Sequence, residues 1–241
     1  MTITHILFDM FGTLVDGRLM TPCYARNLGL AMAARYGGSP EAWANANRRI
    51  MADDYSYYAD LNLEGEHGLD DMWEGLLRTT RALFRLTATP EPDAAELAAL
   101  SRELPYLATR SCDALFPDAR AVIERLHGAG LTLGAASHAI RAQIQGMLLG
   151  ANVMQYFSGP LLAPDVTGTF AKNRRYFLSA GLPPENCLVV DDSPGGIEGA
   201  QAAGMHAVFI YRGEGTPPPS PADHVLTGTL DGLLAYLEIA S

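Results

Sequence analysis

Lysine is almost missing from this chain of 241 residues. Among its 17 basic side chains Lys172 is the one lysine and the rest are arginines; they are outnumbered by 27 acidic side chains, so the net charge is −10. Surfaces that bind nucleic acids need clustered positive charge, so we expect no nucleic-acid partner. Because the chain has no other lysine, any effect of a lysine side chain can be assigned to Lys172.

Cysteine is scarce as well. Cys23, Cys112 and Cys187 form an odd set with no paired spacing, which predicts a reduced, cytoplasmic chain with neither a disulfide nor a zinc site. No apolar run reaches the length of a membrane span, and the N-terminus lacks the order of charges and apolar residues that is typical of a signal peptide. We therefore expect no membrane association.

The most informative stretch lies near the N-terminus. An apolar run from Thr4 to Phe8 predicts a buried strand of a parallel sheet, and the run ends at Asp9. Gly12 permits a tight turn after it, and Thr13 supplies a hydroxyl near the carboxylate. A carboxylate at the C-terminal end of a parallel strand lies where open α/β sheets bind ligands, although an Asp there can also simply cap the next element.

The rest of the chain divides into two regions of different pattern. Residues 16–109 lack strand patterning and predict helices over 23–36, from Ser39 through Tyr55, and over 69–86 and 93–104. From residue 110 onward, apolar runs alternate with helical segments, and the predicted strands cover residues 131–137, 159–163, 187–190, 207–211 and 224–226. This alternation predicts an α/β fold with a doubly wound, mostly parallel, Rossmann-like sheet over residues 1–15 and 110–241, into which a helical cap of residues 16–109 is inserted.

Polar residues follow several of these strands in a recognisable order. Asp9 with Thr13, then Ser137, then Lys172, then Asp191 and Asp192 resemble the four motifs of the haloacid dehalogenase superfamily. The resemblance implies that Asp9 is a nucleophile which forms a covalent aspartyl intermediate, and that the other catalytic residues are Thr13, Ser137, Lys172 and Asp192. It also implies that the insertion closes over Asp9.

The resemblance further implies a cation. Carboxylates brought this close repel one another unless a cation lies between them, and Mg²⁺ prefers oxygen ligands. The implied ligands are Asp9, the backbone carbonyl of Phe11 and Asp192, with Asp191 as a further or alternative ligand. Mg²⁺ is therefore the expected cofactor.

Two positions depart from the pattern of family phosphatases. Phe11 replaces a second Asp that would act as general acid and base, and Gly196 replaces an acidic residue after Asp192. In the 2-haloacid dehalogenase branch an aromatic residue also takes the place of that second Asp, and a halide leaves without a proton. Arg49, in a stretch that resembles the dehalogenase cap, is then predicted to bind the substrate together with Phe11 and His138, and His138 is also a candidate substitute base.

Three functions remain open at this point. The preferred one is hydrolysis of a small 2-halo acid or a similar anion through Asp9, which Phe11 and Arg49 favour. The second is a Mg²⁺-dependent phosphatase or phosphoryl-handling enzyme without the usual acid, which Asp191 and Asp192 favour. The third is a catalytically impaired binding protein, which the joint changes at Phe11 and Gly196 favour. The expected partner is a small anionic substrate, and the expected assembly is a monomer or a homodimer.

Overall fold

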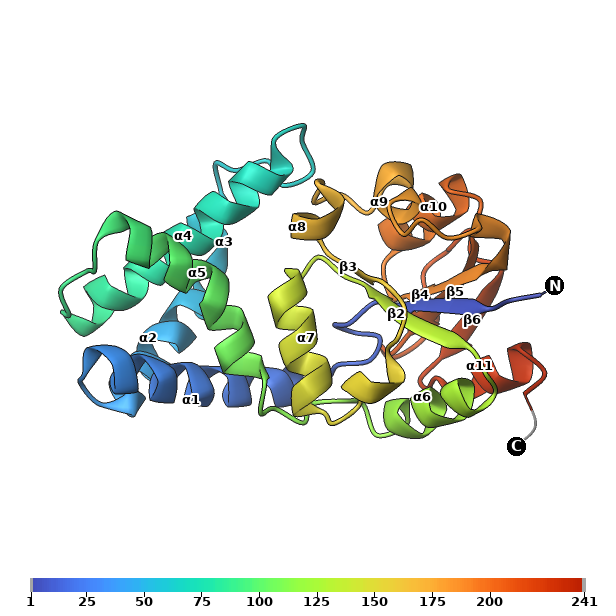
Figure 1. Ribbon diagram of the computed structural model, residues 1–241, viewed down its shortest axis with the longest axis horizontal. Helices are drawn as coiled ribbons and strands as arrows, with labels where there is room; N and C mark the ends of the chain where they lie inside the picture. The colour runs from blue at the N-terminus through green and yellow to red at the C-terminus, as the bar shows by residue number, and fades with distance from the viewer. Residues whose placement is uncertain (1, 240–241) are drawn as a thin grey trace.

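A computed structural model gives the fold, and it describes residues 2–239, except for the side chains of Asp54 and Tyr55. Both residues belong to the stretch that resembles the dehalogenase cap, and the resemblance of their side chains to that cap therefore lies outside what the structure describes. A six-stranded parallel sheet forms one half of the molecule, and a bundle of helices forms the other half (Figure 1). The strands are β1 (His5–Phe8), β2 (Thr132–Ala136), β3 (Leu161–Leu162), β4 (Cys187–Asp191), β5 (His206–Tyr211) and β6 (His224–Thr227).

The sheet has the order β3-β2-β1-β4-β5-β6, as expected for a doubly wound fold. Successive side chains of a strand point to opposite faces, so Ile6 and Phe8 pack in the apolar core on one face and Leu7 in the core on the other. One face is covered by α6 (Ala119–Gly128), α7 (Arg141–Gly150) and α11 (Asp231–Tyr236), and the other by α9 (Arg174–Leu178) and α10 (Pro194–Ala202). The shorter elements are η1 (Met154–Tyr156), α8 (Pro164–Thr167) and η2 (Pro184–Asn186).

The insertion between β1 and α6 is helical, as the sequence predicts. Its elements are α1 (Gly17–Tyr36), α2 (Pro40–Ala52), α3 (Asp54–Tyr58), α4 (Gly68–Thr87) and α5 (Ala94–Thr109). The helix predicted from Ser39 through Tyr55 is divided at Asp53, where the backbone leaves helical geometry (φ −127°, ψ 30°). Trp43 and Phe84 are fully buried in the insertion's own apolar core. None of the described helices is both long and apolar enough to cross a bilayer.

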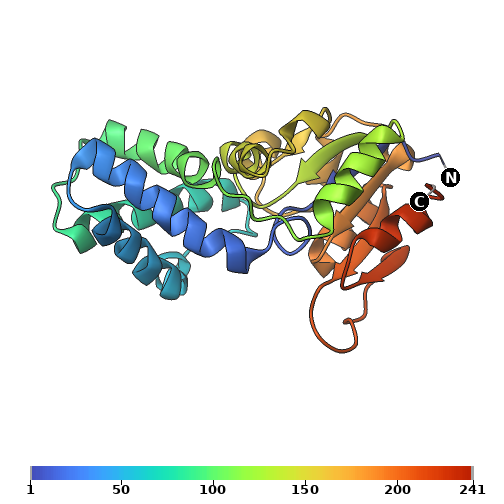
Figure 2. The ribbon, with the colours of Figure 1, turned by 90° about the horizontal axis from the view of Figure 1, so that it is seen from below.

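Two chain segments connect the insertion to the sheet, and they lie side by side (Figure 2). The amide of Asp16 donates to the carbonyl of Ala114 at 2.8 Å, and the amide of Phe116 donates to that of Leu14 at 2.9 Å. These bonds make a short antiparallel pair through which the chain leaves the core and returns to it.

A disulfide between Cys23 and Cys112 lies next to this pair and corrects the prediction of a chain without disulfides. Cys23 belongs to α1 and Cys112 follows α5, so the bond joins the start of the insertion to its end, across a sequence separation of 89. The pairing depends on the insertion folding back on itself, which sequence spacing does not reveal. Cysteine usage therefore no longer favours a cytoplasmic location, which stays a prediction.

The disulfide should stabilise the fold. Closing so long a loop restricts the unfolded chain, so reduction should lower the free energy of unfolding by about 2–4 kcal/mol. Urea titration with and without dithiothreitol measures the change, and Cys23→Ser should remove the response to the reductant. A thiol assay on the unfolded, unreduced chain should find one thiol, that of Cys187. Three reactive thiols, or equal stability in both conditions, would contradict the bond.

Candidate active site

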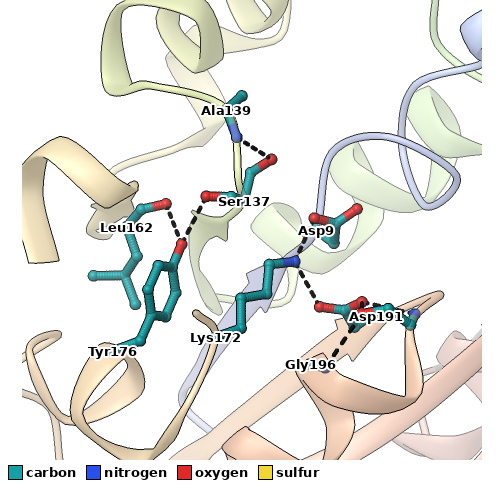
Figure 3. A network of polar contacts seen from close by, with 9 residues as sticks. Asp9, Ser137, Ala139, Leu162, Lys172, Tyr176, Asp191 and Gly196 are labelled. Carbon is teal, nitrogen blue, oxygen red and sulfur yellow. Dashed lines mark hydrogen bonds and ion pairs between the residues drawn. The ribbon is translucent and has the colours of Figure 1, made fainter. Parts of the chain in front are cut away.

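The sheet order brings two carboxylates together at its C-terminal edge. β1 and β4 are neighbours, with Phe8 paired to Val190, so Asp9 directly after β1 lies beside Asp191 at the end of β4. The strand order reverses at this point, which is where open α/β sheets bind ligands. Lys172, from the loop before α9, reaches between the two carboxylates (Figure 3). Its Nζ lies 2.6 Å from Oδ1 of Asp9 and 2.8 Å from Oδ2 of Asp191.

Burial makes this group of charges unusual. The side chains of Lys172, Asp9 and Asp191 are 3%, 8% and 0% exposed. Burial alone would lower the pKa of Lys172, but the charges of both carboxylates raise it well above its ordinary value, so the ammonium stays protonated. Burial raises the pKa of Asp9 to about 7 against the effect of Lys172, and the charges of Asp191 and Asp192 add to the rise.

Asp192 completes a group of three carboxylates faced by one ammonium. One oxygen from each of Asp9, Asp191 and Asp192 lies within 4.8 Å of the others. Asp192 is exposed on one side, yet the loss of part of its hydration and then the charge of Asp191 raise its pKa to about 6. A hard divalent cation such as Mg²⁺ fits this all-oxygen, electron-rich set.

The three carboxylates differ in how many hydrogen bonds their oxygens already accept from the protein. Oδ1 of Asp191 accepts from the amide and the hydroxyl of Ser193, at 2.8 and 2.6 Å, and its Oδ2 accepts from Lys172. Asp9 and Asp192 therefore have more free oxygen than Asp191 to offer a cation. This agrees with the ligand set implied by the sequence, Asp9, the Phe11 carbonyl and Asp192, which stays a prediction.

Two glycines leave room for these carboxylates. A Cβ atom at Gly12, whose φ is +79°, would overlap the carboxylate of Asp192, and one at Gly196 would overlap that of Asp191. An acidic side chain at Gly196 would therefore need the space that Asp191 fills. This gives a physical reason for the departure from the family pattern at that position.

Ser137, which follows β2, is buried close to these charges. Its Oγ accepts from the amide of Ala139 at 3.3 Å. The hydroxyl of the fully buried Tyr176 lies 2.9 Å from the carbonyl oxygen of Ser137 and 2.8 Å from that of Leu162, so it ties the ends of β2 and β3 together (Figure 3). Sequence reasoning missed Tyr176, because the acceptors of its hydroxyl are backbone carbonyls.

Thr13 is buried, and within residues 2–239 its Oγ1 is the one fully buried side-chain oxygen or nitrogen without a hydrogen-bond partner. Its carbonyl accepts two bonds from Arg212, at 3.2 and 2.8 Å. Arg212 also pairs with Asp118 and stacks on the ring of Phe116 at 3.8 Å. These contacts of Arg212, which the sequence did not predict, fix the loop that carries Thr13.

The predicted binding residues are more scattered. Phe11 is 38% exposed and lines a cavity that extends into the helical insertion. His138 stacks on Phe170, and partial burial followed by the charge of Lys172 lowers its pKa to about 4. Arg49 is exposed on α2 and is not among the described residues that line the cavity. The structure thus brings Asp9, Lys172, Asp191 and Asp192 together and leaves Arg49 apart.

Comparison with known proteins adds a family and a fold. A family model described as haloacid dehalogenase-like hydrolase matches residues 3–204. Curated relatives include the phosphoglycolate phosphatase of Aliivibrio fischeri, 31% identical over 133 residues that cover 52% of this chain and 58% of the relative. The phosphoserine phosphatase of Thermus thermophilus is 29% identical over 121 residues, 48% of each chain. The chain thus spans about half the length of the curated relatives it matches.

Solved structures resemble the whole chain. The HAD-hydrolase YfnB of Bacillus subtilis, with magnesium bound, has a TM-score of 0.64 at 19% identity and covers 99% of this chain and 100% of its own. The L-2-haloacid dehalogenase of Xanthobacter autotrophicus, with chloropropionic acid covalently bound, has a TM-score of 0.57 at 19% identity, with 100% of both chains covered. At such identities the similarity shows the fold alone.

Lys172→Met should destabilise the protein strongly. It leaves Asp191 buried and uncompensated, and breaking a buried ion pair costs about 3–5 kcal/mol. Adding Asp191→Asn should restore part of the loss, because the buried charge is then removed too. Denaturant unfolding of the two single variants and the double variant measures this coupling. Arg174→Met, an exposed neighbour, is the control and should change little; a similar loss in both Met variants would contradict the role of the pair.

Mg²⁺ should bind to the wild type, and Asp192→Ala should weaken or abolish this binding. The substitution removes the carboxylate with the most free oxygen and reduces the excess of negative charge. Calorimetry with MgCl₂ measures the affinity, and Asp70→Ala, an exposed acidic residue of α4, controls for the change in net charge. Equal affinity in all three proteins would show that the cation, if bound, lies elsewhere.

Proposed function

Because this chain belongs to the haloacid dehalogenase-like hydrolase family, we propose that it hydrolyses phosphorylated substrates whose leaving group departs without a proton. The observation that carries the proposal is the cluster of Asp9, Asp191 and Asp192, which a single ammonium only partly neutralises. Such a site suits a bound cation together with a dianionic phosphoryl group. The curated relatives named as phosphatases support the same direction.

Asp9 is the nucleophile in this proposal. Lys172 holds its Oδ1, so Oδ2 is the oxygen that attacks phosphorus. A bond forms between that oxygen and phosphorus, the bond from phosphorus to the leaving oxygen breaks, and its electron pair departs with the leaving group. Water then attacks the aspartyl phosphate, which releases phosphate and restores Asp9. A divalent cation, when bound, offsets the charge of the phosphoryl oxygens.

The other residues orient and stabilise charge. Lys172 neutralises part of the charge on Asp9 throughout, since it stays protonated. The hydroxyl of Ser137, whose backbone is held by Tyr176, donates to a phosphoryl oxygen. The unpartnered hydroxyl of Thr13 is a further donor for the loaded site.

Neither of the two residues considered from the sequence, Phe11 and His138, supplies a general acid at pH 7. The ring of Phe11 has no proton to give, and His138 with a pKa near 4 is neutral at pH 7. A leaving alkoxide would therefore depart unprotonated. Acyl phosphates and aryl phosphates, whose leaving groups are stable as anions, are the substrates that this arrangement favours.

Dehalogenation of a 2-halo acid is the second candidate. Phe11 favours it, because a halide also leaves without a proton. The exposed position of Arg49 removes the residue that we expected to receive the halide or carboxylate, and the cluster of carboxylates disfavours a bound carboxylate without a cation. The preference from the sequence is therefore reversed.

The leaving group should decide the rate. General acid catalysis is typically worth about 10²–10⁴-fold, so with Mg²⁺ the kcat/KM for acetyl phosphate should exceed that for a simple alkyl phosphate by a factor of this order or more. Phe11→Asp should raise the alkyl phosphate activity relative to acetyl phosphate, and Asp9→Asn should abolish both.

Phosphate release and, with 2-chloropropionate, halide release are measured in parallel on the same preparations. Efficient hydrolysis of unactivated alkyl phosphates by the wild type would contradict the leaving-group argument. Halide release in the absence of phosphate release would favour the second candidate instead.

A further inference from the structure

The helical insertion contains a cavity of about 270 Å³ whose chemistry differs from that of the carboxylate cluster. Its walls come from α1 to α5, and the core contributes Phe11 and Gln143 of α7. None of the described residues that line this space, which we call the cap cavity, carries a charge. Ligand pockets of ~300–1,000 Å³ are commonly apolar with a few polar groups, and the cap cavity is slightly smaller than that range.

Three of the six hydroxyl-bearing residues that line the cap cavity bond to carbonyls of their own helices. The Oγ1 atoms of Thr79 and Thr80 donate to the carbonyl of Leu76 at 3.0 and 2.8 Å, and the Oγ of Ser101 donates to the carbonyl of Ala98 at 2.9 Å. These bonds lie within their own helices. The hydroxyls of Thr79, Thr80 and Ser101 therefore add little polarity to the cap cavity.

Asn47 of α2 is different. It is 6% exposed and lines the cap cavity, but its side-chain amide forms no hydrogen bond with any residue that the structure describes. Asn45, on the same helix, is exposed, and its side chain accepts from Arg48 at 2.6 Å. An amide that no protein group engages can donate to and accept from a ligand group in the cap cavity.

Phe11 is the residue of the cap cavity's wall that lies nearest in sequence to the reacting groups. It follows Asp9 by two residues, and its ring lines the cavity. The C-terminal ends of the strands, where Asp9 lies, face the insertion that contains the cap cavity (Figure 1).

We propose that the cap cavity binds an uncharged, mainly apolar tail of the substrate, and that Asn47 hydrogen-bonds a carbonyl, hydroxyl or amide group of that tail. The binding of a phosphoryl group at Asp9 rests on the proposed function. The preference of the cap cavity for an uncharged, apolar group does not depend on it. A charged tail is disfavoured, because the lining offers it no counter-charge to replace its hydration. The substrate class is then an activated phosphate with a neutral, medium-length tail.

Direct binding tests the cavity without turnover. Calorimetry in the absence of Mg²⁺, where the negative cluster repels carboxylates, compares hexanamide with hexanoate on the wild type. Hexanamide should bind and hexanoate should bind more weakly. Asn47→Leu should weaken hexanamide binding about three- to tenfold, as expected for one hydrogen bond, and Asn45→Leu should not. Leu76→Trp, which fills the cavity, should weaken it independently of Asn47.

Equal hexanamide binding by the wild type, Asn47→Leu and Leu76→Trp, with the same melting temperature for all three, would overturn the proposal. Tighter binding of hexanoate than of hexanamide would overturn it as well.

Turnover separates this proposal from the proposed function. Across acetyl to hexanoyl phosphate, kcat/KM should rise about fourfold per buried methylene, and the ratio of hexanoyl to acetyl phosphate should fall in Leu76→Trp. A flat series with active acetyl phosphate would overturn the cavity proposal and leave the proposed function standing. Hexanamide binding as expected, with no acyl phosphate hydrolysed, would overturn the proposed function instead.

Discussion

The ion pairs of Lys172 are the constraint on which the rest of the site depends. The register of β1 and β4 places Asp9 and Asp191 side by side in a buried edge of the sheet, where two carboxylates without a counter-charge would repel each other. The single lysine of the chain resolves this for both of them with one ammonium. Lys172 pairs with Asp9 and Asp191 but not with Asp192, so the three carboxylates keep an excess of negative charge. This excess favours the binding of a further cation.

The carboxylates determine the shape of the surrounding backbone as well as its charge. Asp192 lies against Gly12 and Asp191 against Gly196, so a side chain at either glycine would displace a carboxylate. Arg212 donates two hydrogen bonds to the carbonyl of Thr13 in the loop that follows β1. The loop after β1 is thus fixed by contacts with residues far along the chain. This explains how a buried hydroxyl such as that of Thr13 can stay without a protein partner.

Sequence patterns predicted the parts of this structure that follow from local periodicity. The strands, the helical insertion and the position of Asp9 at a strand end belong to this group. Tyr176 could not be recognised, since its partners are backbone carbonyls. Arg49 was expected in the site, but residues two positions apart are about 200° apart on a helix, so Asn47 faces the cavity while Arg49 faces solvent. A helix register of this kind becomes visible only when the neighbouring helices are placed.

Phe11 is where the two halves of the site meet, and it links their selectivities. Phe11 stands where an acid would otherwise be, so this position has no proton to give to a leaving alkoxide. Its ring forms part of the cap cavity's wall. An Asp at the same position, two residues along the chain from Asp9, would put a charge in the wall of an otherwise uncharged cavity. The proposed preference for leaving groups that need no proton and the proposed preference for an apolar tail therefore both depend on Phe11. Substituting it should change both together.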